Sequence, residues 1–196
     1  MRLHWYWSSN PQKVRLALEE LGLSYELSPV NLTTRAQKEP GYLDIHPRGK
    51  VPALEIDGTV LWESGAALLY LGEREQRLWP SSGPDRATAL NLLFLESSAW
   101  QAQASAYFYN RVVMPFIGAQ PDKSRVEKAS KKIHPLLDLL DRQLGQSDYL
   151  LGEFSLVDCA YAPWLPVLDL ETFPSLERWR SRLTQRASWQ ACEFTY

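Results

Sequence analysis

Cysteine is scarce in this sequence, with only Cys159 and Cys192 among 196 residues. Two cysteines cannot build the disulfide framework of a small secreted protein, and such sparse use is typical of a reducing compartment. The N-terminal residues MRLHWYWSSNPQ also lack the hydrophobic region and the cleavage site of a secretory signal. We therefore expect a cytoplasmic protein.

Long apolar runs and an excess of one charge are missing as well. No apolar stretch reaches the roughly 18 residues that a membrane span requires. Lysine and arginine total 21 against 23 aspartate and glutamate, a net charge of −2, whereas nucleic-acid binders usually carry a positive excess. The densest basic cluster, Lys128, Lys131 and Lys132, falls in a helical pattern and is expected to be a solvated face. Neither a membrane nor a nucleic acid is expected as a partner.

Motifs for metal, hydrolytic or nucleotide chemistry are also lacking. The three histidines stand far apart, at positions 4, 46 and 134, which is not the clustering that metal ligands require. The sequence contains no CxxC pair, no HExxH helix, no GxSxG elbow and no glycine-rich phosphate loop. We therefore expect no metal and no tightly bound cofactor.

What the sequence does have is enough apolar material for a core, with 45% hydrophobic and 22% charged residues. Residues 1–76 alternate between strand and helix patterns. A strand run at 3–7 is followed by a helical pattern ending at Gly22 and a second strand run at 24–27. An irregular stretch, 33–46, precedes two strand runs joined by Asp57-Gly58, which is a strong hairpin signal. A further helix begins at Glu63-Ser64.

After residue 76 the strand patterns disappear. Residues 77–84 combine turn residues with a break in periodicity and are interpreted as a linker. Helical patterns then cover 85–118, 123–144, 155–168 and 174–185, with prolines interrupting the third. Ser155 and Asp158 have the spacing of a capping box, with Phe154 and Cys159 at the staple positions. The sequence thus predicts a small α/β domain, an all-α domain over 85–196, and structural roles for these capping residues.

These segments resemble the cytosolic glutathione transferase family, in which a thioredoxin-like α/β domain precedes an all-α helical domain. The resemblance is carried, in the order of the family, by SSNPQKVRLALEELGLSYE, HPRGKVPALEIDGTVLWESGAALLYL, LLGEFSLVDCAYAPWLPVL and FPSLERWRSRLTQRAS. The sequence departs from the family at Ala187, where proline is usual, and at Gly65, often arginine or alanine. The resemblance implies conjugation of glutathione, as co-substrate, to small hydrophobic electrophiles, and it implies a homodimer.

The family motifs imply where glutathione binds. Ser64 starts a predicted helix, whose free amides and added hydroxyl suit a carboxylate. The resemblance gives Ser64 and Glu63 the γ-glutamyl end, although an ordinary N-cap serine beside a solvated glutamate would show the same pattern. It also implies a cis bond at Val51-Pro52, whose backbone would pair with the cysteinyl unit. Lys50, with Arg48 as the second candidate, would approach the glycyl carboxylate, or either side chain would remain solvated.

The residue that activates the thiol lies, in this family, between the first strand and the first helix. Because no cysteine precedes Cys159, the cysteine-type members are excluded. Ser8 has the family's spacing to the helix, six residues before Val14, and is ranked first. Tyr6, at the end of the first strand run, is ranked second, and Ser9 third; a site without an essential hydroxyl stays open, as does a helix-capping role for either serine.

The electrophile is expected in an open, apolar pocket between Trp7 and the long helix of the second domain. Two other functions remain possible on the same fold: a glutathione or ligand carrier with little turnover, and a protein-interaction module. Candidates for the far wall of the pocket share helical spacing, so they cannot all face it, and core burial is favoured for any one: Trp100, Tyr107, Phe108 and Tyr109.

Overall fold

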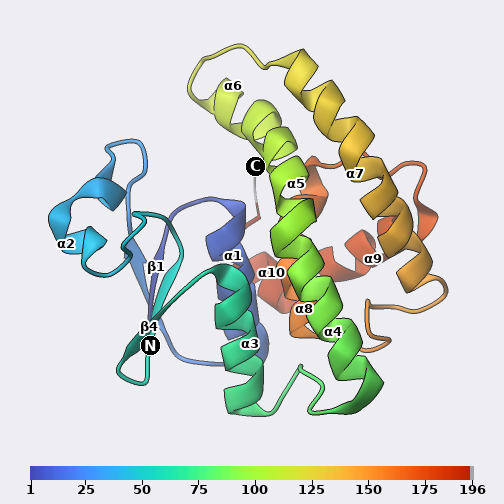
Figure 1. The fold of residues 1–196 in the computed structure, drawn as a ribbon, viewed down its shortest axis with the longest axis horizontal. Coiled ribbons are helices and arrows are strands. Elements are labelled where there is room, and N and C mark those ends of the chain that lie inside the picture. Colours follow the sequence, from blue (N-terminus) through green and yellow to red (C-terminus); the bar gives the residue numbers. More distant parts are fainter. Residues whose placement is uncertain (195–196) are drawn as a thin grey trace.

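A four-stranded mixed sheet forms the N-terminal part of the computed structural model, which describes residues 1–194 (Figure 1). The strand order is β2-β1-β3-β4, with β1 parallel to β2 and antiparallel to β3, and with β3 antiparallel to β4. The first predicted strand ends two residues early and the second lies two residues later than its run. The strands are β1 (Arg2–Trp5), β2 (Glu26–Pro29), β3 (Ala53–Ile56) and β4 (Thr59–Trp62).

Local signals in the sequence set the turns of this domain. Gly22 ends helix α1 (Ser9–Leu21) with a φ of +68°, a left-handed conformation that glycine adopts without strain. Asp57 and Gly58 have φ values of +50° and +76° and turn β3 into β4, as the hairpin signal predicts. The irregular stretch contains two short helices, η1 (Ala36–Lys38) and α2 (Pro40–Leu43).

Helices cover both faces of the sheet (Figure 1). Helix α1 and helix α3 (Ser64–Glu75) lie between the sheet and the helical domain, and α2 lies on the opposite side. Leu3, Leu54 and Leu68, from the sheet and α3, are fully buried. The β-α-β and β-β-α halves therefore form the thioredoxin-like arrangement expected from the sequence.

The predicted helix over 85–118 is a succession of α-helical and π-helical turns. Between α3 and α4, residues 76–82 form the connection to this helical part. The elements that follow are α4 (Gly83–Leu95), η2 (Glu96–Trp100), α5 (Gln101–Phe108), η3 (Tyr109–Val113), α6 (Met114–Phe116), α7 (Lys123–Leu144), α8 (Leu156–Tyr161), η4 (Ala162–Val167), α9 (Pro174–Thr184) and α10 (Ala187–Ala191).

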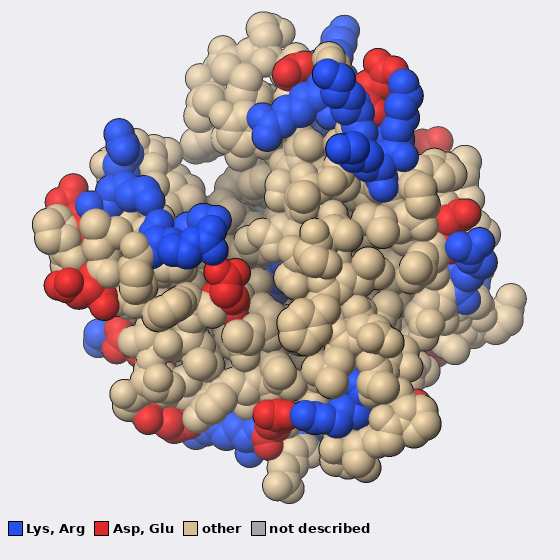
Figure 2. All heavy atoms as spheres, viewed as in Figure 1, with Lys and Arg blue, Asp and Glu red and all other residues tan. Residues whose placement is uncertain are grey.

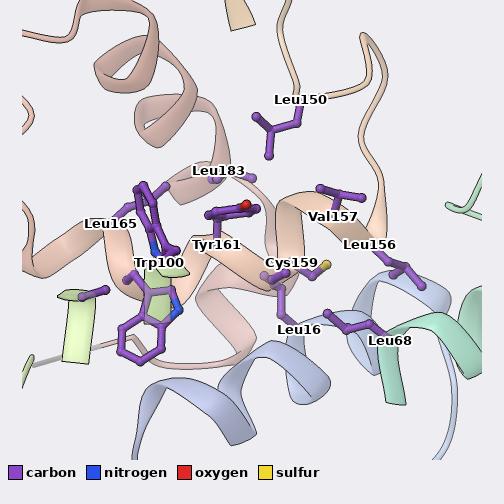
Figure 3. Close-up of a cluster of buried hydrophobic side chains, with 14 of the residues drawn as sticks. Leu16, Leu68, Trp100, Leu150, Leu156, Val157, Cys159, Tyr161, Leu165 and Leu183 are labelled. Atoms are coloured by element: carbon purple, nitrogen blue, oxygen red, sulfur yellow. The ribbon is translucent and has the colours of Figure 1, made fainter. Parts of the chain in front are cut away.

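A cluster of buried side chains lies where the helical domain packs against α1 and α3 (Figure 3). Trp100 packs edge-on against Tyr161, with 5.1 Å between ring centroids, and the Tyr161 hydroxyl donates to the carbonyl of Leu92 at 2.7 Å. Cys159 is fully buried in the same cluster, and burial raises the pKa of its thiol. Within the described chain, no helix is both long and apolar enough to cross a bilayer.

Asp158 forms the predicted capping box at the start of α8. Its carboxylate accepts from the backbone N–H of Ser155 at 2.8 Å, and also from the N–H of Leu150 at 3.1 Å and the indole N–H of Trp179 at 2.9 Å. The structural interpretation of this pair from the sequence is confirmed.

Candidate active site

Strand register brings the three segments predicted to carry the site to one end of the sheet. His4, near the end of β1, pairs with Ala53 at the start of β3, and Ala53 pairs with Trp62 at the end of β4. The residues just beyond these positions are therefore neighbours: 6–8 after β1, 50–52 before β3, and 63–64 after β4.

Ser8 and Tyr6 differ from Ser9 in what they face. Tyr6 and Ser8 line an apolar pocket, and β1 already ends at Trp5, so Tyr6 lies in the loop rather than in the strand. Ser8 is the N-cap residue of α1 and has an extended backbone conformation. Its side chain makes no hydrogen bond to the backbone amides of the first turn of α1, all of which the structure describes. Ser9 is the first helical residue and is only 2% exposed. It does not line the pocket, and its hydroxyl has no hydrogen-bond partner within residues 1–194.

Glu63 and Ser64 form the junction between β4 and α3. Glu63 has φ = +75° and ψ = 114°, a conformation that costs energy for a side-chain-bearing residue and is concentrated at functional sites. Its carboxylate accepts from Arg48 Nη1 at 3.1 Å, and both side chains are mostly exposed. Ser64 is buried at the first turn of α3, where backbone amides are free to bind an anion.

The Val51–Pro52 peptide bond is cis, as the family resemblance implies. Lys50, just before it, is exposed, and the Lys50 carbonyl accepts from the hydroxyl of Tyr42 at 2.6 Å. His46 Nδ1 accepts from the backbone N–H of Arg48 at 3.3 Å. Burial lowers the pKa of His46, so its ring is neutral near pH 7 and can accept this bond.

Gly49 shows why this loop has a fixed shape. Its φ is +55°, and a Cβ at this position would lie 2.4 Å from the carbonyl oxygen of Gln37. The supporting roles of Tyr42, His46 and Gly49 were not predicted from the sequence. Gly49 is the last residue of the sequence HPRG. A glycine at this position was the only sign in the sequence of a backbone with positive φ.

An apolar cavity of about 700 Å³ opens beside Ser8. The polar side-chain groups on its described lining are hydroxyls and indole N–H groups, and no charged residue takes part. Figure 2 shows the surface hollowed between the side that carries α2 and the end that carries α6. The lining comes from the β1–α1 loop, the segment after β2 and the far end of the long helix: Trp5, Tyr6, Trp7, Ser8, Pro29, Leu32, Thr33, Phe108, Val113, Phe116 and Ile117.

Of the four aromatic residues considered for the far wall, only Phe108 lines the cavity. Trp100 is fully buried in the core, and Tyr107 is 3% exposed beneath the guanidinium of Arg111. Tyr109 is 42% exposed, outside the cavity. The expectations that these side chains cannot all face the pocket and that core burial is favoured are thus confirmed for Trp100 and Tyr107.

Comparison with known proteins assigns the family. Residues 7–74 match the family model for the glutathione S-transferase N-terminal domain, and residues 123–189 match that for the C-terminal domain. Glutathione S-transferase 3 of Zea mays is 34% identical over 188 residues, which cover 94% of this chain and 84% of the maize protein. The chain belongs to the glutathione S-transferase family. The resemblance inferred from the sequence, the thioredoxin-like and helical fold, and the transferase activity are thereby confirmed.

This glutathione transferase has relatives in bacteria as well as plants. Glutathione S-transferase GstB of Escherichia coli K12 is 31% identical over 192 residues, covering 91% of this chain and 90% of that protein. The solved structure of glutathione S-transferase-I bound with lactoylglutathione superposes with a TM-score of 0.86 at 27% identity, covering 97% of both chains. The similarity extends through both halves of the fold.

Proposed function

We propose that this transferase binds glutathione across the three converging segments and conjugates its thiolate to a small, neutral, apolar electrophile. The observation that carries the proposal is the position of Ser8, which belongs at once to the N-terminus of α1 and to the wall of the apolar cavity. A thiol held at this boundary has polar donors on one side and an apolar space on the other.

The ends of glutathione have different charge requirements, and the segments offer matching groups. The γ-glutamyl carboxylate would bind the buried Ser64 hydroxyl and the free amides of α3, while Glu63 would face the ammonium. The backbone of Val51, before Pro52, would pair with the cysteinyl unit. The glycyl carboxylate would lie near the exposed ammonium of Lys50. Similarity to a structure with bound lactoylglutathione supports this placement.

The thiol can be activated by hydrogen bonding and the helix N-terminus alone. A thiol with a pKa near 8.5 needs roughly 2.7 kcal/mol to shift by about two units. A hydrogen bond to an ionised group supplies roughly 1.5–3 kcal/mol, and a helix N-terminus adds roughly 0.3–2 kcal/mol. We assign the donor role to Ser8, with Tyr6 as the alternative donor and Ser9 third. The hydroxyl donates to the sulfur, and the thiolate forms the new carbon–sulfur bond while the leaving group departs with its electron pair.

The chemistry of the pocket limits the electrophile. Because its described lining has no charged side chain, an anionic or cationic electrophile would lose hydration without compensation. A neutral aromatic or aliphatic electrophile buries apolar surface there at about 25 cal/mol per Å². Buried, unpaired Cys159 and Cys192 fit the reducing cytoplasm, where glutathione is available.

We also propose that the transferase is a homodimer through the face shown in Figure 2. Exposed positions along α4 and α5 recur at helical spacing without a charged residue: Ala87, Asn91, Phe94, Ser98 and Ala102. Phe94 is 64% exposed, and few charged side chains lie over the centre of this face, where α3, α4 and α5 meet the viewer. An uncharged helical face with an exposed aromatic side chain suits an isologous contact with a second copy.

A pair of single substitutions tests the division between binding and chemistry. Ser8→Ala should lower kcat for a neutral haloaromatic electrophile by about ten-fold or more, with the Kd for glutathione nearly unchanged, because the hydroxyl acts on the developing thiolate. Ser64→Ala should mainly raise that Kd. Ser9→Ala tests the third-ranked donor; because Ser9 is buried outside the pocket, it should lower kcat less than Ser8→Ala does. A ten-fold loss in Tyr6→Phe with full activity in Ser8→Ala would move the donor role to Tyr6.

A further inference from the structure

A fully buried ion pair joins the active-site helix to the helical domain. Lys13, in the second turn of α1, lies with its Nζ 2.6 Å from Glu96 Oε1, and the two side chains are 0% and 2% exposed. Glu96 is the first residue of the π-helical segment η2. Burial lowers the pKa of the Lys13 ammonium, and the adjacent carboxylate acts in the opposite direction.

Glu96 is shared with Trp164, which extends the contact toward the pocket. The indole N–H of Trp164 donates to the same Oε1 atom at 2.9 Å, and Lys13 Nζ lies 5.1 Å from the centre of the Trp164 ring. Trp164 packs edge-on against Phe108, with centroids 6.4 Å apart, and Phe108 lies 6.2 Å from Trp7. Phe108 and Trp7 are neighbouring residues of the cavity lining, one from the long helix and one from the β1–α1 loop.

These contacts link α1 and η2 to two residues of the pocket lining. Trp7 and Lys13 flank the start of α1; Trp7 contacts Phe108 directly, and Lys13 reaches Phe108 through Glu96 and Trp164. A change in the spacing between α1 and η2 would therefore move the Trp7 and Phe108 rings relative to each other. A buried ion pair is weak as a source of stability compared with apolar residues of similar volume, but its short, directional contact fixes one arrangement.

We propose that the Lys13–Glu96 pair is a positioning device that fixes how the Phe108 and Trp7 rings lie against each other on the pocket lining, and so the size of electrophile that the pocket accepts. This inference rests on the proposed use of the pocket by the electrophile. Lys13 and Glu96 act through Trp164 and do not touch the substrate.

The test compares two ion pairs that both join α1 to the helical domain. The double variant Lys13→Met with Glu96→Leu removes the pair at the pocket end and keeps apolar volume in its place. The control, Arg186→Met with Glu20→Leu, removes the contact at the other end of α1, where Arg186 Nη2 lies 2.7 Å from Glu20 Oε2. Two neutral dyes that differ in size, 1-aminonaphthalene and N-phenyl-1-aminonaphthalene, report pocket binding by fluorescence without turnover.

The pocket-end variant should change the ratio of the two dye affinities by about five-fold or more, with the Kd for glutathione within about two-fold of the wild type. The far-end control should keep the dye ratio within about two-fold, even where it lowers the thermal midpoint. Lys13→Arg, which keeps the positive charge, should keep the ratio of the two dye affinities close to that of the wild type. Should the double variant fail to fold, Glu96→Gln keeps an oxygen for the Trp164 N–H but removes the charge beside Lys13, and it should also change the ratio of the two dye affinities.

Two results would overturn the inference: an unchanged dye ratio in the pocket-end variant, or an equal change in both double variants. Wild-type protein that binds both dyes but turns over no electrophile would count against the proposed function alone. In that case the dye ratios still decide the role of the pair.

Discussion

At the scale of single residues, the buried carboxyl group of Asp158 links the stability of the helical domain to pH. It is fully buried, and burial raises its pKa to about 6, although hydrogen bonds from Leu150, Ser155 and Trp179 act to lower it. The unperturbed value of 3.8 applies when the chain is unfolded. The native state therefore binds a proton more tightly than the unfolded state does, and between these two values it holds more protons.

This difference predicts a pH-dependent contribution to stability. The contribution of Asp158 to the free energy of unfolding should fall as the pH rises from about 4 to about 6, by at most about 3 kcal/mol. Urea unfolding of wild type and Asp158→Asn across this range measures it, because subtraction cancels the groups common to both. The raised pKa would be contradicted if the free energy of unfolding of the wild type, minus that of the variant, increased with pH.

At the scale of elements, helix α3 approaches the segment that follows it unusually closely. A Cβ added to Gly72 would lie 2.5 Å from Trp79 Cβ and 3.1 Å from Leu156 Cδ1. Trp79 is 8% exposed, so this segment is packed onto α3 and α8 rather than free. We take residues 1–76 and 85–196 as the two domains, and this contact couples them through their connection.

Gly72→Ala should destabilise the protein by about 1–3 kcal/mol, since overpacking exceeds the roughly 1 kcal/mol gain in helix propensity. Gly41→Ala is the matched control, because Gly41 also lies in a helix but has no atom within 4 Å of the added Cβ. Chemical denaturation of both variants gives the comparison. Equal or greater stability in Gly72→Ala would show that Trp79 can move away freely.

The sequence predicted those elements whose determinants are local. The Asp57-Gly58 hairpin, the Gly22 helix end and the Ser155–Asp158 capping box all depend on residues within a few positions of one another. Periodicity left open which of the four aromatic residues of the long helix faces the pocket, because the π-helical segments η2 and η3 interrupt regular helical spacing around them. The Lys13–Glu96 contact joins residues 83 positions apart, and no sequence pattern marks such a pair.

At the scale of the whole molecule, the uncharged face of α4 and α5 predicts that two copies of the chain form a dimer. Phe94→Asp should convert a dimer into a monomer, because a charge at the centre of an isologous contact is buried twice without a partner. Sedimentation equilibrium measures the mass directly. Leu139→Asp on α7, where Leu139 is 39% exposed, is the control and should leave the mass unchanged. Dimeric Phe94→Asp protein would place the interface elsewhere.

The central claim is that donors at the N-terminus of α1 hold the glutathione sulfur as an anion near neutral pH. The most direct measurement is the ultraviolet absorbance of the thiolate, followed by titration of glutathione bound to the wild-type protein and to Ser8→Ala. In the wild type, half of the bound thiol should be ionised roughly two units below the free value near 8.5, and removal of the Ser8 hydroxyl should move that midpoint back toward it. A wild-type midpoint equal to that of free glutathione would contradict the account.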